Sequence, residues 1–202
     1  MISDYKKAKE NLLTCNDFLA GQRFFYENGF VLELGYCELL NDNIQQAKEL
    51  FQSIKEKDIR AKWALNMISM IEGVVYEYPA YFELRNFLEI DLNIFINHYK
   101  GDYVQNIIRY SDFMFTINPE VYKFIGRVFY NNGLQEQAMF FLNRAKSYFY
   151  NDPELHYLLA FIFYNSGDYQ KSLNCANDCL RILPEYFPAI DLINRINTFM
   201  IK

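Results

Sequence analysis

The chain has 202 residues, with 20 basic and 25 acidic side chains and a formal net charge of −5. That length fits one elongated domain or a small pair of domains, and the lack of a basic excess gives no reason to expect nucleic-acid binding. No run of about 18 apolar residues is present, so no membrane-spanning helix is expected, and the charged first residues do not form a signal peptide, which favours a cytoplasmic protein.

The first hundred residues predict a series of helices. Residues 3–15 open with Ser3–Ala8, which resembles Gly167–Ser172 farther along the chain, so they look like the second helix of a pair whose first helix is missing. The chain therefore either begins on a half unit or is a piece of something longer. The apolar segment 17–40, which Gly29 interrupts, precedes a turn at Asn41–Asn43.

Further helical patterns follow that turn. Residues 44–51 repeat the second-helix pattern, 58–73 form a helix that Gly73 ends, and 80–99 form a longer one. Residues 74–85 contain Pro79 and predict an irregular link or a degenerate helix. Gly101–Tyr103 then opens another second helix. The small or polar residues that open the second helices are 39, 59, 32 and 34 positions apart, which indicates about five helix pairs and an N-terminal helix: Ala8, Ala47, Asn106, Ala138 and Ser172.

The clearest pattern is a 34-residue unit that occurs twice, at residues 119–152 and 153–186. A fixed period of this length is typical of a stacked repeat array. Each copy begins with a capping residue and a proline, Asn118-Pro119 and Asp152-Pro153, as helix starts do. Each copy has apolar stripes at helical spacing on both sides of a central glycine: Tyr122, Ile125, Gly126, Phe129, Ala138, Phe141, Leu142 and Ala145, then His156, Leu159, Ala160, Phe163, Ser172, Ala176 and Cys179.

At these residues the sequence resembles the tetratricopeptide repeat family. The Ile125-Gly126 and Leu159-Ala160 steps, Gly133 and Gly167 between the helices, and the closing Pro184 match the family pattern, whereas His156 and Tyr150 depart from it. The resemblance implies an all-α, right-handed superhelix of antiparallel helix pairs, with residues 1–202 as one repeat domain. It also implies a protein with no catalytic residues and no cofactor, which binds other proteins.

In such an array one side of each first helix lines the concave groove, and we call this side the groove face. Its predicted residues miss the core stripes and are expected to be exposed: Glu120, Lys123, Arg127, Tyr130, Asn131, Glu154, Tyr157, Phe161, Tyr164 and Asn165. Exposed Tyr157, Phe161 and Tyr164 suit peptide binding, because rigid aromatics offer contact area at little entropic cost. The alternative is that these aromatics pack on their neighbours. Lys123 and Arg127 would favour a partner segment with some acidic character.

The remaining candidate sites are weaker. Some family members grip a chaperone's C-terminal carboxylate with Lys and Asn, and Lys123 fits that pattern, but Arg127 and Leu158 replace the asparagines. Cys175 and Cys179 share a helix face near His156, but four zinc ligands are not visible, so buried thiols and no metal are expected. Neither histidine belongs to a nucleophile motif, so the sequence predicts no enzyme.

The last helix, residues 188–201, is apolar around much of its circumference. It is either a cap tucked onto the array or a self-association surface, which would make the protein a homo-oligomer. The sequence therefore predicts a scaffold that binds a peptide or helix of another protein. Three alternatives stay open: a chaperone for a secreted protein, the accessory repeat region of a larger enzyme, and a self-assembling structural protein.

Overall fold

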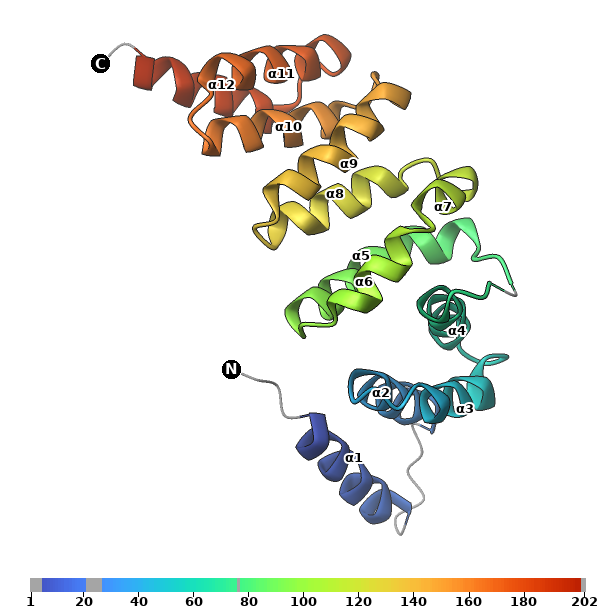
Figure 1. The fold of residues 1–202 in the computed structure, drawn as a ribbon. Helices are drawn as coiled ribbons and strands as arrows, with labels where there is room; N and C mark the ends of the chain where they lie inside the picture. Colours follow the sequence, from blue (N-terminus) through green and yellow to red (C-terminus); the bar gives the residue numbers. More distant parts are fainter. Residues whose placement is uncertain (1–4, 21–26, 76, 201–202) are drawn as a thin grey trace. The chain divides into compact units, whose positions relative to one another are not determined.

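The computed structural model of the chain describes residues 5–20, 27–75 and 77–200, and we discuss only these (Figure 1). Within them all regular structure is helical, which confirms the predicted all-α class. The chain divides into two compact units, Met1–Pro119 and Glu120–Lys202. We describe each unit by itself, and the single superhelix predicted from the sequence, with its right-handed twist, remains a prediction.

The first unit is built from seven helices within the described residues. They are α1 (Tyr5–Ala20), α2 (Glu27–Leu40), α3 (Ile44–Ile54), α4 (Ile59–Glu72), α5 (Tyr81–Asn97), α6 (Gly101–Ile108) and α7 (Ser111–Ile117). Neighbours in the chain pack together through this unit, and α4 also packs against α6. Gly29 lies inside α2 and does not interrupt it, and the irregular link is shorter than predicted because α5 already begins at Tyr81. Residues 21–26 of the predicted apolar segment 17–40 lie outside the described residues.

The predicted second helix after Gly101 is divided. α6 ends at Ile108, Arg109 and Tyr110 form a turn, and α7 starts at Ser111. The helix predicted over residues 80–99 also ends earlier than the sequence pattern indicates, so Tyr99 lies outside it. α5 ends at Asn97, and Tyr99 has φ of 59° and is 88% exposed. The left-handed backbone carries this side chain away from the core that Leu92 and Phe95 occupy.

A buried polar cluster holds α2, α4 and α5 together. The Asp91 carboxylate is 1% exposed and accepts hydrogen bonds from Trp63 Nε1 at 2.5 Å and from the Tyr36 hydroxyl at 3.1 Å. Arg60 Nη2 lies 3.3 Å from the second carboxylate oxygen. Burial is the main cause that raises the pKa of Asp91, although its hydrogen bonds and Arg60 oppose the shift. Every partner in this cluster is therefore needed to keep the carboxylate in the core.

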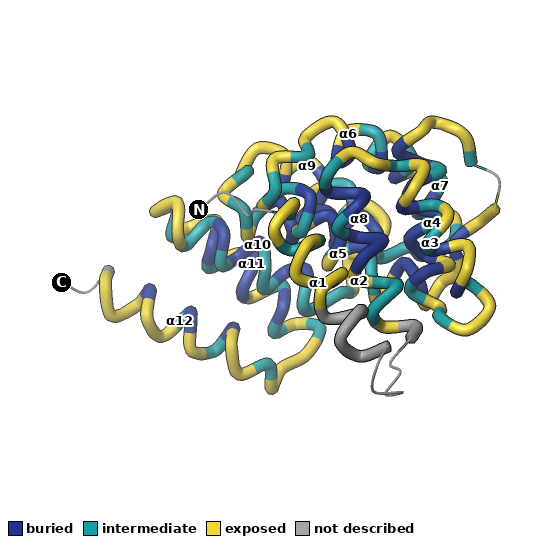
Figure 2. Tube along the Cα trace, turned by 90° about the horizontal axis from the view of Figure 1, so that it is seen from below, coloured by how far each residue is buried: buried dark blue, intermediate teal, exposed yellow. Residues whose placement is uncertain are grey.

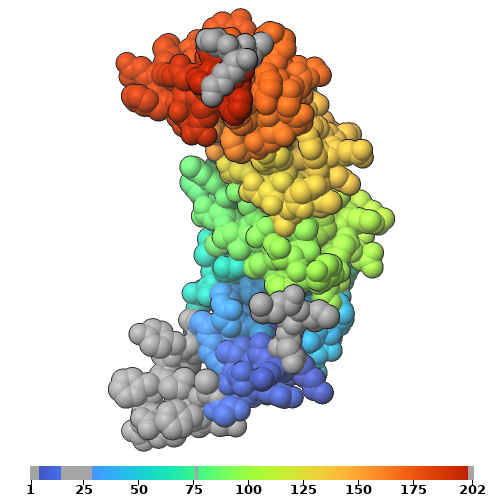
Figure 3. All heavy atoms as spheres, turned by 90° about the vertical axis from the view of Figure 1, so that its left-hand side faces the viewer, coloured from blue at the N-terminus to red at the C-terminus, as the bar shows by residue number. Residues whose placement is uncertain are grey.

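The second unit contains α8 (Val121–Asn131), α9 (Gln135–Tyr148), α10 (Pro153–Asn165), α11 (Tyr169–Ile182) and α12 (Phe187–Met200). α8 packs on α9, α10 on α11, and α12 on both α10 and α11. Figure 3 shows these helices as successive bands of this unit's surface, from yellow α8 and α9 through orange to red α12. The predicted start of the first helix is two residues early: α8 begins at Val121 with Glu120 in the N-cap position, and Asn118 ends α7. Asp152 caps α10 as predicted, by accepting from the Leu155 N–H at 3.1 Å.

Small residues allow the paired helices of this unit to approach closely. A Cβ atom added to Gly126 of α8 would lie 2.6 Å from Leu142 Cγ of α9, so only glycine fits there. In the next pair, the Ser172 hydroxyl of α11 donates to the Ala160 carbonyl of α10 at 2.7 Å. The predicted stripes are buried, except that Ile162 replaces Phe163 in the core. Small residues at these positions therefore explain the close helix contacts.

The same turn closes five helices across the two units. In each turn one residue has a positive φ, and its N–H donates a hydrogen bond to the carbonyl of the residue three positions earlier. The N–H of the next residue donates to the carbonyl five positions before it. Glycine supplies this conformation at Gly73, Gly133 and Gly167, whereas Asp42 and Tyr99 adopt it with φ of 67° and 59°. The turns thus end helices even where the sequence lacks the glycine.

The last helix has a polar outer side within its described side chains. Ala189, Leu192 and Ile196 are buried, while Asp191, Asn194 and Arg195 are exposed. Figure 2 shows this division along α12, with blue only on one side of the helix. Phe187 and Phe199 are nevertheless 77% and 62% exposed. α12 is thus the terminal helix of its unit, and two aromatics remain available for contact. In the described part of the chain, no helix is both long and apolar enough to cross a membrane.

Candidate functional site

The predicted groove face lies on the first helix of each pair in the second unit. Glu120 precedes α8, and Lys123, Arg127, Tyr130 and Asn131 follow along it. The other five residues, Glu154, Tyr157, Phe161, Tyr164 and Asn165, occupy the same positions of α10, 34 residues on. The structure therefore assigns these residues to the two helices expected from the sequence.

Their exposure differs from the expectation. Asn131 and Asn165 are exposed, but Lys123 is only 5% exposed, and the other seven are partly buried. The prediction that Lys123 is exposed is therefore wrong, and Tyr157, Phe161 and Tyr164 are half-buried rather than free in solvent. The prediction of exposure failed because helical spacing shows only which residues share one side of a helix. The exposure of each residue also depends on the contacts that it makes with the neighbouring helix pair.

An ion cluster surrounds Lys123. Its Nζ atom lies 3.0 Å from Glu120 Oε1, 2.8 Å from Asp152 Oδ2 and 3.0 Å from Glu154 Oε2. Arg127 Nη1 lies 2.5 Å from the other oxygen of Glu154. Burial disfavours the charged form of Lys123, but hydrogen bonds to Asp152, Glu120 and Glu154 outweigh it and raise the pKa of the ammonium. Three carboxylates thus neutralise two cations at this end of the face, and its expected preference for an acidic segment stays a prediction.

A row of aromatic rings continues the groove face from α8 across α10. The Tyr130 ring meets Phe161 edge-on at 6.4 Å between centroids, and Phe161 stacks on Tyr157 at 6.2 Å. Tyr157 then packs against Tyr186, at 5.4 Å. The Asn165 amide donates to the Tyr130 hydroxyl and links the two helices. The row is therefore ordered by its own contacts and still leaves part of each ring accessible, because these rings are only partly buried.

The row and the ion cluster are equivalent parts of successive units. Tyr157 is 34 residues after Lys123, and Tyr186 is 34 residues after Asp152. The contact between Lys123 and Asp152 is thus replaced one unit later by the contact between Tyr157 and Tyr186. Sequence reasoning missed Tyr186 and the ion-pairing role of Asp152, although applying the 34-residue offset to each groove-face position would have aligned the two pairs.

Two tyrosines of the row, Tyr157 and Tyr186, have raised pKa values and are therefore neutral at ordinary pH. Burial is the largest cause that raises the pKa of Tyr157, and burial also raises the pKa of Tyr186. Neutral phenols offer an apolar ring and a hydroxyl that can donate a hydrogen bond. This end of the groove face is therefore suited to apolar side chains and to backbone carbonyls of a polypeptide.

The cysteine and histidine candidates occupy core positions. Cys175 and Cys179 are buried, and the pKa of Cys179 is raised to about 11, mainly by burial. His156 Nε2 lies 2.7 Å from the Tyr150 carbonyl, which requires a hydrogen on that nitrogen, and its Nδ1 lies 3.7 Å from Asp178. In the described residues no group of His, Cys, Asp and Glu could hold a metal ion. These side chains pack the helices, as expected for buried thiols.

Comparison with protein families gives one match. Residues 153–186, which form α10 and α11 with the following turn, match the family model described as Tetratricopeptide repeat. A comparison with curated proteins finds no match. Tetratricopeptide repeats are generally non-catalytic and typical of protein–protein interaction scaffolds, and the matched unit carries Tyr157, Phe161 and Tyr164. The predicted resemblance is confirmed for the α10–α11 pair, which is the repeat that the family model recognises.

Proposed function

We propose that the chain is a non-catalytic scaffold that binds a peptide or helical segment of another protein on its groove face. The observation that carries this proposal is the aromatic row of Tyr130, Phe161, Tyr157 and Tyr186, whose rings pack in order on the matched repeat and its neighbour. Aromatics held in place by their neighbours lose little entropy when a partner binds, and this favours their use as anchors.

The chemistry of the face favours an apolar or extended segment. The ion cluster around Lys123 is internally compensated, so it offers no free cation to a partner's carboxylate. The half-buried rings offer apolar surface, and the exposed amides of Asn131 and Asn165 can bond a backbone. We therefore expect a segment with apolar side chains spaced along one side.

The test compares two triple variants in a capture experiment from the native lysate. The first carries Tyr157→Ala, Phe161→Ala and Tyr164→Ala on the groove face. The matched control removes three aromatics that lie elsewhere and are 62%, 58% and 70% exposed: Phe82→Ala, Phe140→Ala and Tyr150→Ala. Both must match the unmodified protein in helicity and melting temperature.

We expect one polypeptide to be retained by the unmodified protein and the control but lost with the groove-face variant. A synthetic segment of that polypeptide should then bind the purified protein with the same pattern. Equal capture by all three proteins, or loss with the control alone, would refute the groove face as the binding site.

Self-association is a second candidate because Phe187 and Phe199 are 77% and 62% exposed on α12. Sedimentation equilibrium over a wide concentration range tests it, with Phe187→Ser as the variant. A mass that rises with concentration, and that this substitution returns to the monomer, would support assembly through α12. A monomer mass at every concentration would exclude it.

A further inference from the structure

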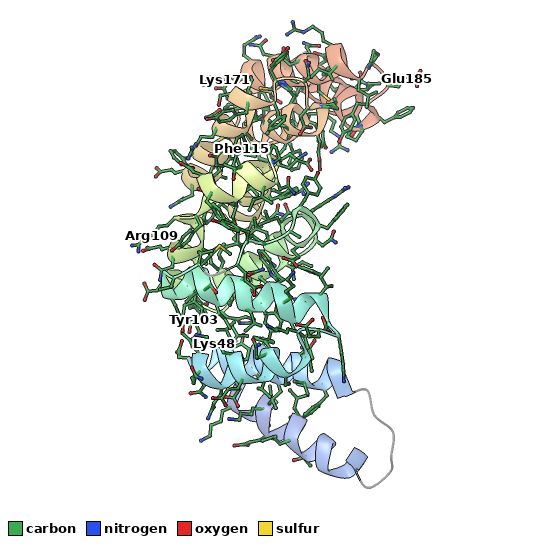
Figure 4. The ribbon with its side chains drawn as sticks, turned by 90° about the vertical axis from the view of Figure 1, so that its right-hand side faces the viewer. Lys48, Tyr103, Arg109, Phe115, Lys171 and Glu185 are labelled. Carbon is green, nitrogen blue, oxygen red and sulfur yellow. The ribbon has the colours of Figure 1, made fainter. Side chains whose placement is uncertain are left out.

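The first unit contains a pocket between α3 and α4, and no groove-face residue belongs to its lining. These helices lie side by side, and Lys48 extends from α3 in Figure 4. The residues that line the pocket come from one side of each helix and from the loop before α5. The pocket has an open volume of about 570 Å³ and is lined by Lys48, Gln52, Lys55, Lys62, Leu65, Asn66, Ser69 and Glu77.

The spacing along each helix explains why these side chains converge. Lys48, Gln52 and Lys55 are at i, i+4 and i+7 of the α3 segment, so they share one side. The four lining residues of α4 follow the same rule, at i, i+3, i+4 and i+7 from Lys62 to Ser69. Two rows of mainly polar residues therefore line the pocket, and three of these residues are lysines.

The lysines differ in how far neighbouring carboxylates neutralise them. Lys48 Nζ is held by both oxygens of Glu72, at 2.9 and 3.2 Å. Lys62 Nζ is 4.0 Å from Glu83, beyond hydrogen-bonding distance. For Lys55, the ion pairs of the described residues include no carboxylate partner. Lys55 and Lys62 therefore keep hydrogen-bonding capacity for a ligand.

Glu83 cannot easily move to satisfy Lys62. Its side chain is 1% exposed, and the same Oε2 atom accepts from the Ala80 N–H at 2.9 Å and from the Asn66 amide at 3.3 Å. Asn66 is itself 4% exposed and lines the pocket, so a fixed polar group forms part of its wall. Lys55 and Lys62 thus line a pocket whose nearest carboxylate, Glu83, is fixed in place by its own hydrogen bonds.

We propose that this pocket binds a carboxylate side chain of an extended acidic segment in a partner protein. Two donors from Lys55 and Lys62 match the two oxygens of one carboxylate. Lys48 is already held by Glu72, so only Lys55 and Lys62 keep donors, and these suit one carboxylate rather than the successive phosphates of a nucleic-acid backbone. Leu65 and the lysine methylenes can contact an adjacent apolar residue, and Gln52 can bond the peptide backbone.

The probe is an octapeptide of Gly, Ser and Leu with two central Glu residues, and the matched probe carries Gln in their place. Binding is followed by amide chemical-shift changes of the labelled full-length protein. The test variant is Lys55→Gln with Lys62→Gln. The control, Lys6→Gln with Lys57→Gln, removes the same charge from exposed lysines outside the pocket.

We expect the Glu peptide to shift the amides of α3 and α4 and the Gln peptide to leave them in place. The pocket variant should weaken binding about fivefold or more, since surface charge contacts contribute modestly, while the control should change it less than twofold. Higher salt should weaken binding, because these ammonium groups are partly exposed.

Three outcomes would overturn the proposal. The first is the absence of pocket shifts with the Glu peptide in an otherwise folded protein. The second is equal weakening by the pocket and control variants, which would indicate net charge alone. The third is stronger binding of inorganic phosphate or a single-stranded oligonucleotide at the same amides, which would assign a general anion site. All three are separate from the groove-face test, because they concern a different unit of the chain.

Discussion

The close contact between Gly126 and Leu142 provides a quantitative test of how the α8–α9 pair is packed. A Cβ on Gly126 would lie 2.6 and 2.7 Å from Leu142 Cγ and Cδ2, and 3.2 Å from the Ala138 carbonyl oxygen. Carbon atoms are at their best separation near 3.5–4.0 Å, so Gly126→Ala creates an overlap of about 1 Å with a branched carbon. The helices must separate or Leu142 must leave its rotamer.

Overpacking of this kind costs about 1–3 kcal/mol, and the better helix propensity of alanine returns about 1 kcal/mol. We expect Gly126→Ala alone to lower the free energy of unfolding by about 1 kcal/mol. Leu142→Ala alone should cost about 2–5 kcal/mol, since Leu142 is fully buried and its removal leaves a cavity. In the double variant the new methyl group occupies part of that cavity.

The sign of the Gly126→Ala effect should therefore reverse with the background. It destabilises the natural chain but should stabilise the Leu142→Ala variant, by up to about 1 kcal/mol. The following repeat already carries this pair of alanines, as Ala160 and Ala176. Urea unfolding of the four proteins, followed by far-UV circular dichroism, measures the cycle. If Gly126→Ala costs the same in both backgrounds, within about 0.5 kcal/mol, the two sites are independent and the packing argument fails.

Three further predictions concern other residues. Tyr99→Gly should raise the free energy of unfolding by about 0.5–1 kcal/mol, because a non-glycine residue at positive φ is strained; an unchanged or lower denaturation midpoint would contradict this. Lys123→Met should cost about 2 kcal/mol at neutral pH, because it removes the ammonium that three carboxylates share. Because the folded-state pKa of Lys123 is raised, its contribution to the free energy of unfolding is complete below about pH 10.4 and is lost at higher pH. A difference in the free energy of unfolding between the natural chain and the variant that stays constant from neutral to strongly alkaline pH would refute the ion cluster. Cys175 and Cys179 should resist iodoacetamide in the folded protein but react after unfolding, as intact-mass spectrometry would show, and rapid labelling of both in the native state would contradict their burial.

Helix positions were largely predictable because they depend on nearby residues. Asp152 caps α10, Gly133 and Gly167 end first helices, and the stripe from Tyr122 to Phe129 is buried as its spacing requires. Each of these features involves residues within about two turns of one another, so a single sequence carries the information. The repeat period also indicated which helices form pairs, and the small residues lie where the paired helices are in close contact.

Predictions failed where local rules competed with each other. Tyr99 continues an apolar stripe, but the chain turns before it, and the same turn occurs elsewhere with glycine. The second helix after Gly101 stops at Ile108, although its apolar pattern extends beyond that residue. Helix ends of this kind lack a distinctive capping residue, and tertiary packing decides where they fall.

The sequence by itself determined that this protein is all-α and contains a tetratricopeptide-like repeat, and it identified the helices that carry the groove face. Only the tertiary structure decided what that face presents. Lys123 meets Asp152 and Glu154, which lie 29 and 31 residues away in the chain, and Lys62 approaches Glu83 across 21 residues. Whether a charge is free or neutralised depends on such through-space contacts, which helical periodicity does not encode. For that physical reason, the repeat could be recognised from residue spacing, whereas its candidate binding surfaces required the packed helices.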